Sequence, residues 1–204
     1  MKYAFFPGCV SQGGAPELYT ATKLICSKLG VEIEEISGWT CCGAGVMQEK
    51  NQLFGDTLNA RTFAKAEELG LPILTICSTC QGVMGQANLR MKRDPAYLAE
   101  INSHLAEEGL EYKGTAEPKH LLWILIEDFG LDSLVSHLTR SLSGLRVAPF
   151  YGCYIVRPTE ALDIEDHPER QTSLESLIEA VGATLIDFEG KTRCCGFPIL
   201  TYNE

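Results

Sequence analysis

The segment LPILTICSTC, residues 71–80, carries the strongest structural signal in this chain of 204 residues. It begins with an apolar run of strand length and ends in two cysteines spaced as C-x-x-C. Short apolar runs of this kind are typical of strands buried on both faces of a parallel sheet. We therefore predict a strand over residues 71–76 that passes into a helix at Cys77.

Upstream of this segment, strand-like and helix-like patterns alternate. Residues 2–6 form a short apolar run that ends at a Pro-Gly pair, and residues 31–36 are apolar on one side. Helical periodicity covers residues 16–29 and 51–69, and a glycine follows each of these segments. This order predicts an α/β fold with a parallel sheet covered by helices on both faces.

Downstream, residues 94–140 show a mostly helical pattern. Residues 145–151 and 184–188 are strand-like, and residues 171–181 between them are helix-like. We expect His120, in the first of these regions, to start a helix or to lie at an interface rather than to bind a metal.

Two motifs occur twice in the chain, which indicates a duplicated α/β domain. FFPGCV at residues 5–10 is echoed by PFYGCY at 149–154. ISGWTCCGAG at residues 36–45 is echoed by FEGKTRCCGFP at 188–198, a separation too long for a solenoid repeat. We predict a first domain with a helical extension, called copy one (residues 1–143), and a partial second domain, called copy two (residues 144–204).

The chain contains nine cysteines. This share is below that of a small disulfide scaffold, and an odd number leaves at least one thiol unpaired. The cysteine usage therefore favours a reducing compartment, and we predict a cytoplasmic protein that reaches a membrane only through partners. The net charge of −10 and the scattered basic residues argue against nucleic acid as a partner. The apolar runs are too short for a direct membrane span.

Eight of the nine cysteines fall within the duplicated motifs. Because the carboxyl ends of parallel strands share one edge of a sheet, we expect the copy-one cysteines to converge there. Cys26 stands alone inside a predicted helix, where we expect it to pack in the core. Copy one contains Cys9, Cys41, Cys42, Cys77 and Cys80, and copy two contains Cys153, Cys194 and Cys195.

Five thiolates at one edge exceed the four ligands of a zinc site and the four of an ordinary cubane cluster. Adjacent cysteines such as Cys41 and Cys42 do not readily bind one metal atom, but they can bind neighbouring irons of one cluster. Soft thiolate ligands suit iron–sulfur chemistry. Two other interpretations stay open, which are a structural zinc with a spare thiol and thiol–disulfide exchange at the C-x-x-C pair.

These motifs resemble the CCG-type cysteine-rich domain of heterodisulfide reductase B subunits. Glycolate oxidase iron–sulfur subunits, lactate-utilisation proteins and an archaeal-type succinate dehydrogenase subunit share this domain. The resemblance implies tandem Rossmann-like, parallel-sheet domains, each of which supplies five cysteines to a non-cubane [4Fe-4S] cluster. It implies a complete ligand set in copy one, formed by Cys9, Cys41, Cys42, Cys77 and Cys80.

In copy two, Cys153, Cys194 and Cys195 match the first three ligands of a second set. The second C-x-x-C has no counterpart there, so we expect a C-terminally truncated family member with an incomplete second cluster site.

The resemblance also implies a function. It indicates an oxidoreductase subunit of a heterodisulfide-reductase-like complex that reduces a disulfide to two thiols at the cluster iron. Activity is expected to need a ferredoxin-type iron–sulfur subunit and a flavoprotein subunit. The alternative is an electron-transfer or anchor subunit of an archaeal-type succinate dehydrogenase or related flavin oxidoreductase, which relays electrons towards quinone. A third class is a zinc-stabilised interaction module without a redox role.

Overall fold

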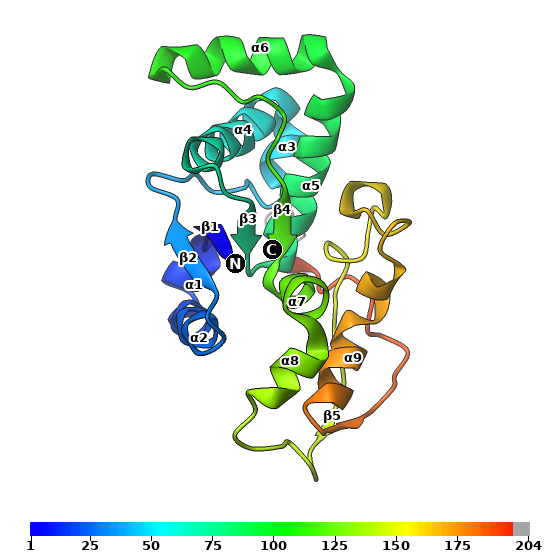
Figure 1. Ribbon diagram of the computed structural model, residues 1–204. Helices are drawn as coiled ribbons and strands as arrows, with labels where there is room; N and C mark the ends of the chain where they lie inside the picture. The colour runs from blue at the N-terminus through cyan, green and yellow to red at the C-terminus, as the bar shows by residue number, and fades with distance from the viewer. Residues whose placement is uncertain (198–204) are drawn as a thin grey trace.

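A four-stranded parallel sheet forms the centre of copy one in the computed structural model, which describes residues 1–197 (Figure 1). The strands lie in the order β2-β1-β3-β4, and all neighbours run parallel. Phe5 of β1 aligns with Glu35 of β2 and with Leu74 of β3. This topology confirms the predicted α/β class. The strands are β1 (Lys2–Phe6), β2 (Glu32–Glu35), β3 (Ile73–Thr75) and β4 (Pro118–His120).

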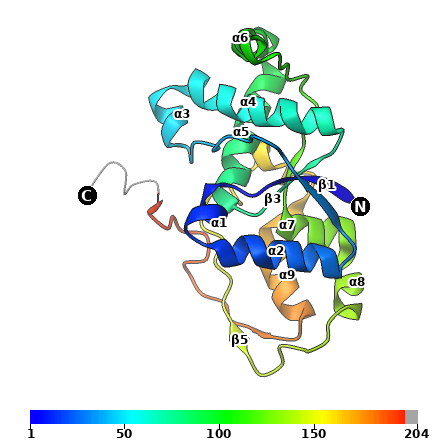
Figure 2. The same cartoon turned by 90° about the vertical axis from the view of Figure 1, so that its left-hand side faces the viewer.

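Helices cover both faces of this sheet, as Figure 2 shows from the side. Tyr3 and Phe5 of β1 pack on one face with Cys26 of α2 (Pro16–Lys28), so Cys26 is the buried packing residue that was predicted. Ala4 and Phe6 pack on the opposite face with α4 (Gln52–Leu69) and α5 (Ser78–Arg93). Because successive side chains of a strand point to opposite faces, the four buried residues 3–6 of β1 require this double cover.

Local capping signals explain where the main helices begin and end. The side chain of Asn51 accepts a hydrogen bond from the backbone N–H of Phe54 at 3.0 Å and starts α4. Gly70, with a φ of 64°, ends the same helix in the left-handed conformation that glycine adopts without strain. Asp94 accepts hydrogen bonds from two backbone N–H groups at the start of α6 (Pro95–Leu105). The predicted helices over residues 16–29 and 51–69 are therefore confirmed.

The region predicted as mostly helical, residues 94–140, contains a strand. After α6 and η1 (Ala106–Glu108) the chain forms β4, whose His120 aligns with Thr75 of β3. A three-residue strand is too short to show a sequence period, and it forms here because it pairs with the open edge of β3. Helical structure then resumes in α7 (Leu121–Trp123), the π-helix η2 (Ile124–Gly130) and α8 (Leu131–Ser136).

Copy two forms a smaller parallel sheet from β5 (Arg146–Val147) and β6 (Thr184–Leu185). Both strands are shorter than the predicted ones. Tyr151, Ile155 and Leu162 pack against Leu122 and Trp123 of α7, so the core of copy two is built partly from copy one. The boundary at residue 143 stays a prediction. The other elements of copy two are η3 (Glu160–Leu162), η4 (Pro168–Thr172) and α9 (Ser173–Ala180).

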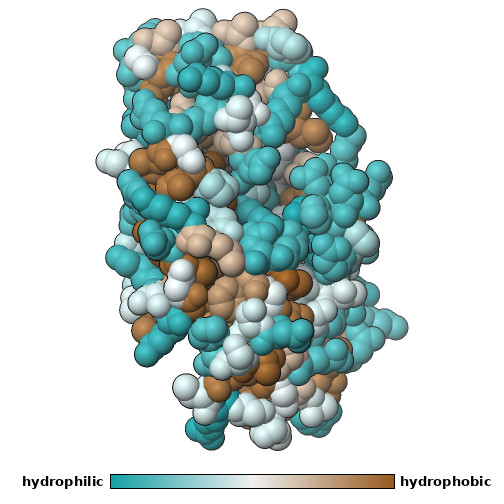
Figure 3. Space-filling view, in the orientation of Figure 1, coloured by the Kyte–Doolittle hydropathy of each residue, from teal (hydrophilic) through white to brown (hydrophobic). Residues whose placement is uncertain are grey.

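The surface alternates between polar and apolar areas. The face in Figure 3 shows small brown patches that are separated by teal and white residues. Within residues 1–197, no helix combines the length and the apolar character that a membrane crossing requires.

Candidate metal centre

The five cysteines of copy one gather at the carboxyl edge of its sheet. Cys9 follows β1 and begins α1 (Cys9–Gly13), whereas Cys77 follows β3 and is the N-cap of α5. The sulfur atoms of Cys42 and Cys80 lie 3.3 Å apart, and those of Cys9 and Cys41 lie 3.7 Å apart. The hydrogen bonds between Cys77 and Cys80 and between Cys41 and Cys42 complete the connections, so all five thiols form one group.

This group has a buried side and an open side. Cys42 and Cys80 are buried and Cys77 is partly buried, whereas Cys9 and Cys41 are exposed. A molecule bound at this group would therefore contact the protein through the buried cysteines. Its other side would remain accessible to solvent or to a partner protein.

The loop after Cys42 has an unusual backbone. Gly43, Ala44 and Gly45, which lead into α3 (Val46–Lys50), all have positive φ, at 86°, 54° and 83°. Positive φ is uncommon for a residue with a side chain such as Ala44. This turn points the backbone N–H of Ala44 at the Cys42 sulfur, with a separation of 3.4 Å.

Two side chains that the sequence analysis did not identify hold this loop in place. The carbonyl of Cys42 accepts hydrogen bonds from Gln48 Nε2 at 2.9 Å and from Asn59 Nδ2 at 3.1 Å. Gly55 of α4 leaves room for Gln48, because a Cβ there would lie 2.8 Å from Gln48 Cδ. One sequence feature could have identified Asn59. It is a polar residue on the buried face of α4, one turn before Phe63.

Hydrogen bonds among the thiols set their charge. Bonds from Cys41 and Cys80 lower the pKa of Cys42 to about 4, although burial opposes the effect. A bond from Cys80 lowers the pKa of Cys77 to about 6, and backbone N–H groups at the start of α5 help. The donors Cys41 and Cys80 have raised pKa values for the same reason. These hydrogen bonds therefore favour the thiolate forms of Cys42 and Cys77.

The residues present fit an iron–sulfur group. The donor set consists of sulfur alone, which suits soft metals, and it exceeds what one tetrahedral zinc can use. Gly8, with a φ of 76°, brings its backbone close to this set, because a Cβ there would lie 3.3 Å from the Cys80 sulfur. The clustered cysteines are thus consistent with iron–sulfur binding.

Copy two repeats part of this arrangement. Burial raises the pKa of Cys153, and the nearby Cys194 and Cys195 add to the shift, so these three cysteines also lie close together. Cys194 and Cys195 are exposed. The last residue of the repeated motif, Pro198, lies outside the described residues.

His120 has the structural role that the sequence suggested. It is the N-cap of α7, where its Nδ1 accepts a hydrogen bond from the backbone N–H of Leu122 at 3.2 Å. Burial lowers its pKa to about 4, so the imidazole is neutral at physiological pH.

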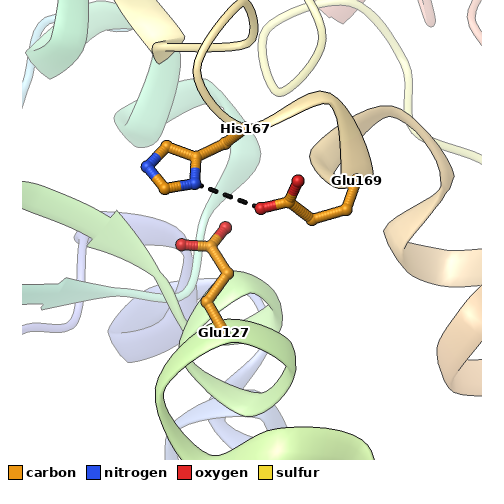
Figure 4. Close-up of side chains that lie close together, drawn as sticks. All are labelled: Glu127, His167 and Glu169. Carbon is orange, nitrogen blue, oxygen red and sulfur yellow. Dashed lines mark hydrogen bonds and ion pairs between the residues drawn. The ribbon is translucent and has the colours of Figure 1, made fainter.

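A second group of possible metal ligands consists of Glu127, His167 and Glu169 (Figure 4). His167 Nδ1 lies 3.1 Å from a Glu169 oxygen. The Glu127 carboxylate is already occupied by Arg170, at 2.7 and 3.0 Å, and by Lys119 at 2.8 Å. A metal ion there would meet two positive side chains, so we assign no metal to this group.

A parallel α/β sheet with five cysteines grouped at its carboxyl edge, followed by a second smaller copy, defines a class of cysteine-rich domain proteins. The chain belongs to the CCG cysteine-rich domain family, which matches residues 3–85 and 147–204. The family model thus covers the duplicated motifs of both copies.

Two curated relatives illustrate this family. The chain is 40% identical over 196 residues to the 8-methylmenaquinol:fumarate reductase membrane anchor subunit of Wolinella succinogenes, covering 96% of this chain and 67% of that protein. It is 36% identical over 196 residues to the B subunit of the Ferredoxin/F(420)H(2)-dependent CoB-CoM heterodisulfide reductase of Methanosarcina acetivorans, covering 96% and 65%. The chain therefore spans about two thirds of the length of these relatives, both of which are named as subunits of reductases.

A solved structure supports the fold. The crystal structure of a hypothetical protein from Helicobacter pylori superposes with a TM-score of 0.70 and 15% sequence identity, over 94% of this chain and 34% of that one. At this level of identity the likeness concerns the fold alone.

Proposed function

We propose that this chain is an iron–sulfur redox subunit in which Cys9, Cys41, Cys42, Cys77 and Cys80 hold one [4Fe-4S] cluster. The observation that carries the proposal is the convergence of five cysteine sulfurs at one edge of the sheet. The non-cubane form of the cluster follows from the resemblance to the family. Cys153, Cys194 and Cys195 would form part of a second site.

When bound, such a cluster supplies single electrons and a Lewis-acidic iron. The protein's own residues prepare the site. Cys42 and Cys77 offer thiolates without loss of a proton, and Gln48 and Asn59 hold the Cys42 backbone so that its sulfur keeps one position. Phe6 and Trp39 are in edge-to-face contact, with their ring centroids 5.2 Å apart. They belong to the same apolar cluster as Cys42 and Cys80.

The reaction we propose is the reduction of a disulfide within a heterodisulfide-reductase-like complex. Two electrons and two protons convert R–S–S–R′ into R–SH and R′–SH, so the S–S bond breaks and two S–H bonds form. The electrons would come from a ferredoxin-type iron–sulfur subunit and a flavoprotein subunit. The sequence similarity to the B subunit of a heterodisulfide reductase supports this proposal.

A second candidate is an electron relay between a flavoprotein and quinone, without disulfide chemistry. The specific observation in its favour is the 40% identity to a fumarate reductase subunit, which exceeds the 36% identity to the heterodisulfide reductase subunit. In this case the open side of the cysteine group would face a partner protein rather than a disulfide.

Metal analysis tests the shared part of both candidates. Chain purified without oxygen is expected to contain about four iron and four acid-labile sulfide per complete site. Zinc without sulfide would contradict the proposal.

In the assembled complex, Cys41→Ala is expected to abolish disulfide cleavage while the subunits stay together. Unchanged disulfide turnover would refute the disulfide reaction, and retained quinol-linked transfer in a complex inert to disulfides would favour the relay.

A further inference from the structure

Tyr154 of copy two fits closely against two glycines of copy one. A Cβ at Gly45 would lie 2.1 Å from Tyr154 Oη, and a Cβ at Gly82 would lie 2.3 Å from the Tyr154 carbonyl oxygen. Carbon atoms do not approach oxygen this closely without displacement, so both positions need a residue without a side chain. Tyr154 therefore occupies space that exists because positions 45 and 82 are glycine.

The two glycines belong to the segments that carry the copy-one cysteines. Gly45 ends the left-handed turn after Cys42, and Gly82 lies in α5, two residues after Cys80. Tyr154 itself directly follows Cys153. One residue thus contacts both cysteine-bearing segments of copy one while it is bonded to a cysteine of copy two.

The same face of α5 continues this contact. Gly85 lies close to the chain of η3, since a Cβ there would lie 2.4 Å from the carbonyl oxygen of Ala161. Figure 1 shows the gold segment of copy two that contains η3 beside α5, the helix that begins beside Cys77. The backbone of copy two is therefore packed on the element that carries Cys80.

We propose that Tyr154 is a positioning residue that sets the separation between the cysteine group of copy one and that of copy two. Its ring and backbone act as a spacer between Cys153 and the Cys42 loop. Its hydroxyl makes no hydrogen bond within residues 1–197 and borders a cavity of about 280 Å³, so the effect comes from shape. The importance of this separation for electron or substrate transfer rests on the proposed function, but the spacing itself does not.

Thiol reactivity tests the spacer. In Gly82→Ala, the added methyl group meets the Tyr154 backbone, which cannot move aside as a flexible side chain could. We expect the iodoacetamide alkylation rate of Cys153, followed by mass spectrometry on the full chain, to rise about ten-fold, and that of Cys42 to stay within about two-fold. Gly13→Ala is the control, because nothing lies within 4 Å of its added Cβ. An unchanged Cys153 rate, or an equal rise at all nine cysteines, would overturn the proposal.

A rescue experiment separates positioning from general stability. In Gly45→Ala the new methyl group meets Tyr154 Oη, whereas the next ring atom would lie 3.2 Å away. Tyr154→Phe removes that oxygen but not the backbone strain that alanine meets at a φ of 83°. We expect Gly45→Ala to raise the Cys153 rate about ten-fold, Tyr154→Phe alone to leave it unchanged, and the double variant to have a rate between those of Gly45→Ala and the native protein. Failure of Tyr154→Phe to lower the rate of the Gly45→Ala variant would contradict the spacer role.

Cysteines bound to a cluster would not react with iodoacetamide, so the rates are compared on the metal-free full chain. Their outcome then does not depend on the proposed function. If the chain binds no iron but the Cys153 effects appear, the proposed function alone fails. If iron binds and the Cys153 rate does not respond to Gly82→Ala, the spacer role alone fails.

Discussion

The two copies build the same cysteine turn in different surroundings. Gly43 and Gly196 have φ angles of 86° and 83°. In each copy a backbone N–H lies 3.4 Å from a cysteine sulfur two residues earlier, from Ala44 to Cys42 and from Phe197 to Cys195. Cys42 is nevertheless buried, whereas Cys195 is exposed. The CCG turn is therefore a local property of the sequence, and the burial of its thiols comes from the helices around it.

The sheets differ in the same way. Copy one has four parallel strands that are buried on both faces, whereas the described part of copy two has a pair of two-residue strands. A two-stranded sheet is marginal on its own. Copy two also contacts copy one, through the stacking of Arg170 on the Trp123 ring at 4.5 Å and through the ion pair of Arg170 with Glu127.

The largest expected effect comes from removing one cysteine from each copy. Cys42 contacts Cys41 and Cys80 at the centre of the five-thiol group. We expect Cys42→Ala to reduce the iron content of copy one from about four per chain to less than about one. The matched variant Cys195→Ala is expected to leave that iron unchanged, as measured by metal analysis of protein purified without oxygen. Equal losses in both variants would show that the two copies do not hold separate sites.

The next effect concerns the ion pair that joins the copies. Glu127→Gln removes the carboxylate that pairs with Arg170. Because the Arg170 side chain is only 8% exposed, its positive charge would then be buried without this partner. We expect the free energy of unfolding in urea to fall by about 3 kcal/mol. Glu34→Gln removes the exposed pair with Lys2 and is expected to leave the unfolding curve unchanged. A comparable loss in both variants would contradict the special weight of the buried pair.

The stability of the fold is expected to depend on pH through His120, which lies beside Tyr151 and Ile155 of copy two. His120 takes up a proton near pH 6.5 in the unfolded chain but only near pH 4 in the folded protein, because burial opposes its charge. The contribution of His120 to the stability of the folded state is therefore complete above pH 6.5, and about 3 kcal/mol of it is lost as the pH falls towards 4.

We test this with His120→Asn, which keeps an acceptor for the N–H of Leu122. The free energy of unfolding of this variant, measured from pH 7 to 4, is expected to have a shallower slope than that of the native protein. Parallel slopes would show that His120 is not the source of the acid sensitivity.

The smallest effect concerns helix caps. Asn51 caps α4 of copy one, whereas the N-cap of α9 in copy two, Thr172, makes no such side-chain hydrogen bond. Asn51→Ala is expected to lower the free energy of unfolding by about 1 kcal/mol, and Thr172→Ala is expected to have little effect. Thermal unfolding of the two variants measures both losses of stability. A larger loss of stability for Thr172→Ala than for Asn51→Ala would contradict the assignment of Asn51 as the stronger helix cap.

Much of the fold of copy one was predictable because its signals are local. Apolar runs of strand length, helix periods and terminal glycines identified β1, α2, α4 and the start of α5. The strand β4 was missed because its three residues have no period and pair only with an edge that the chain creates elsewhere. The short strands of copy two were overestimated because apolar content does not show where pairing ends.

For the site, the sequence established which cysteines belong together, because strands of a parallel sheet end at one edge. It also encoded the CCG turn through its glycine. The fold in three dimensions determined which of these thiols are charged, that Gln48 and Asn59 hold the Cys42 loop, and that Tyr154 lies between the copies. These properties depend on burial and on contacts between residues distant in sequence, and neither leaves a mark on the local pattern of amino acids.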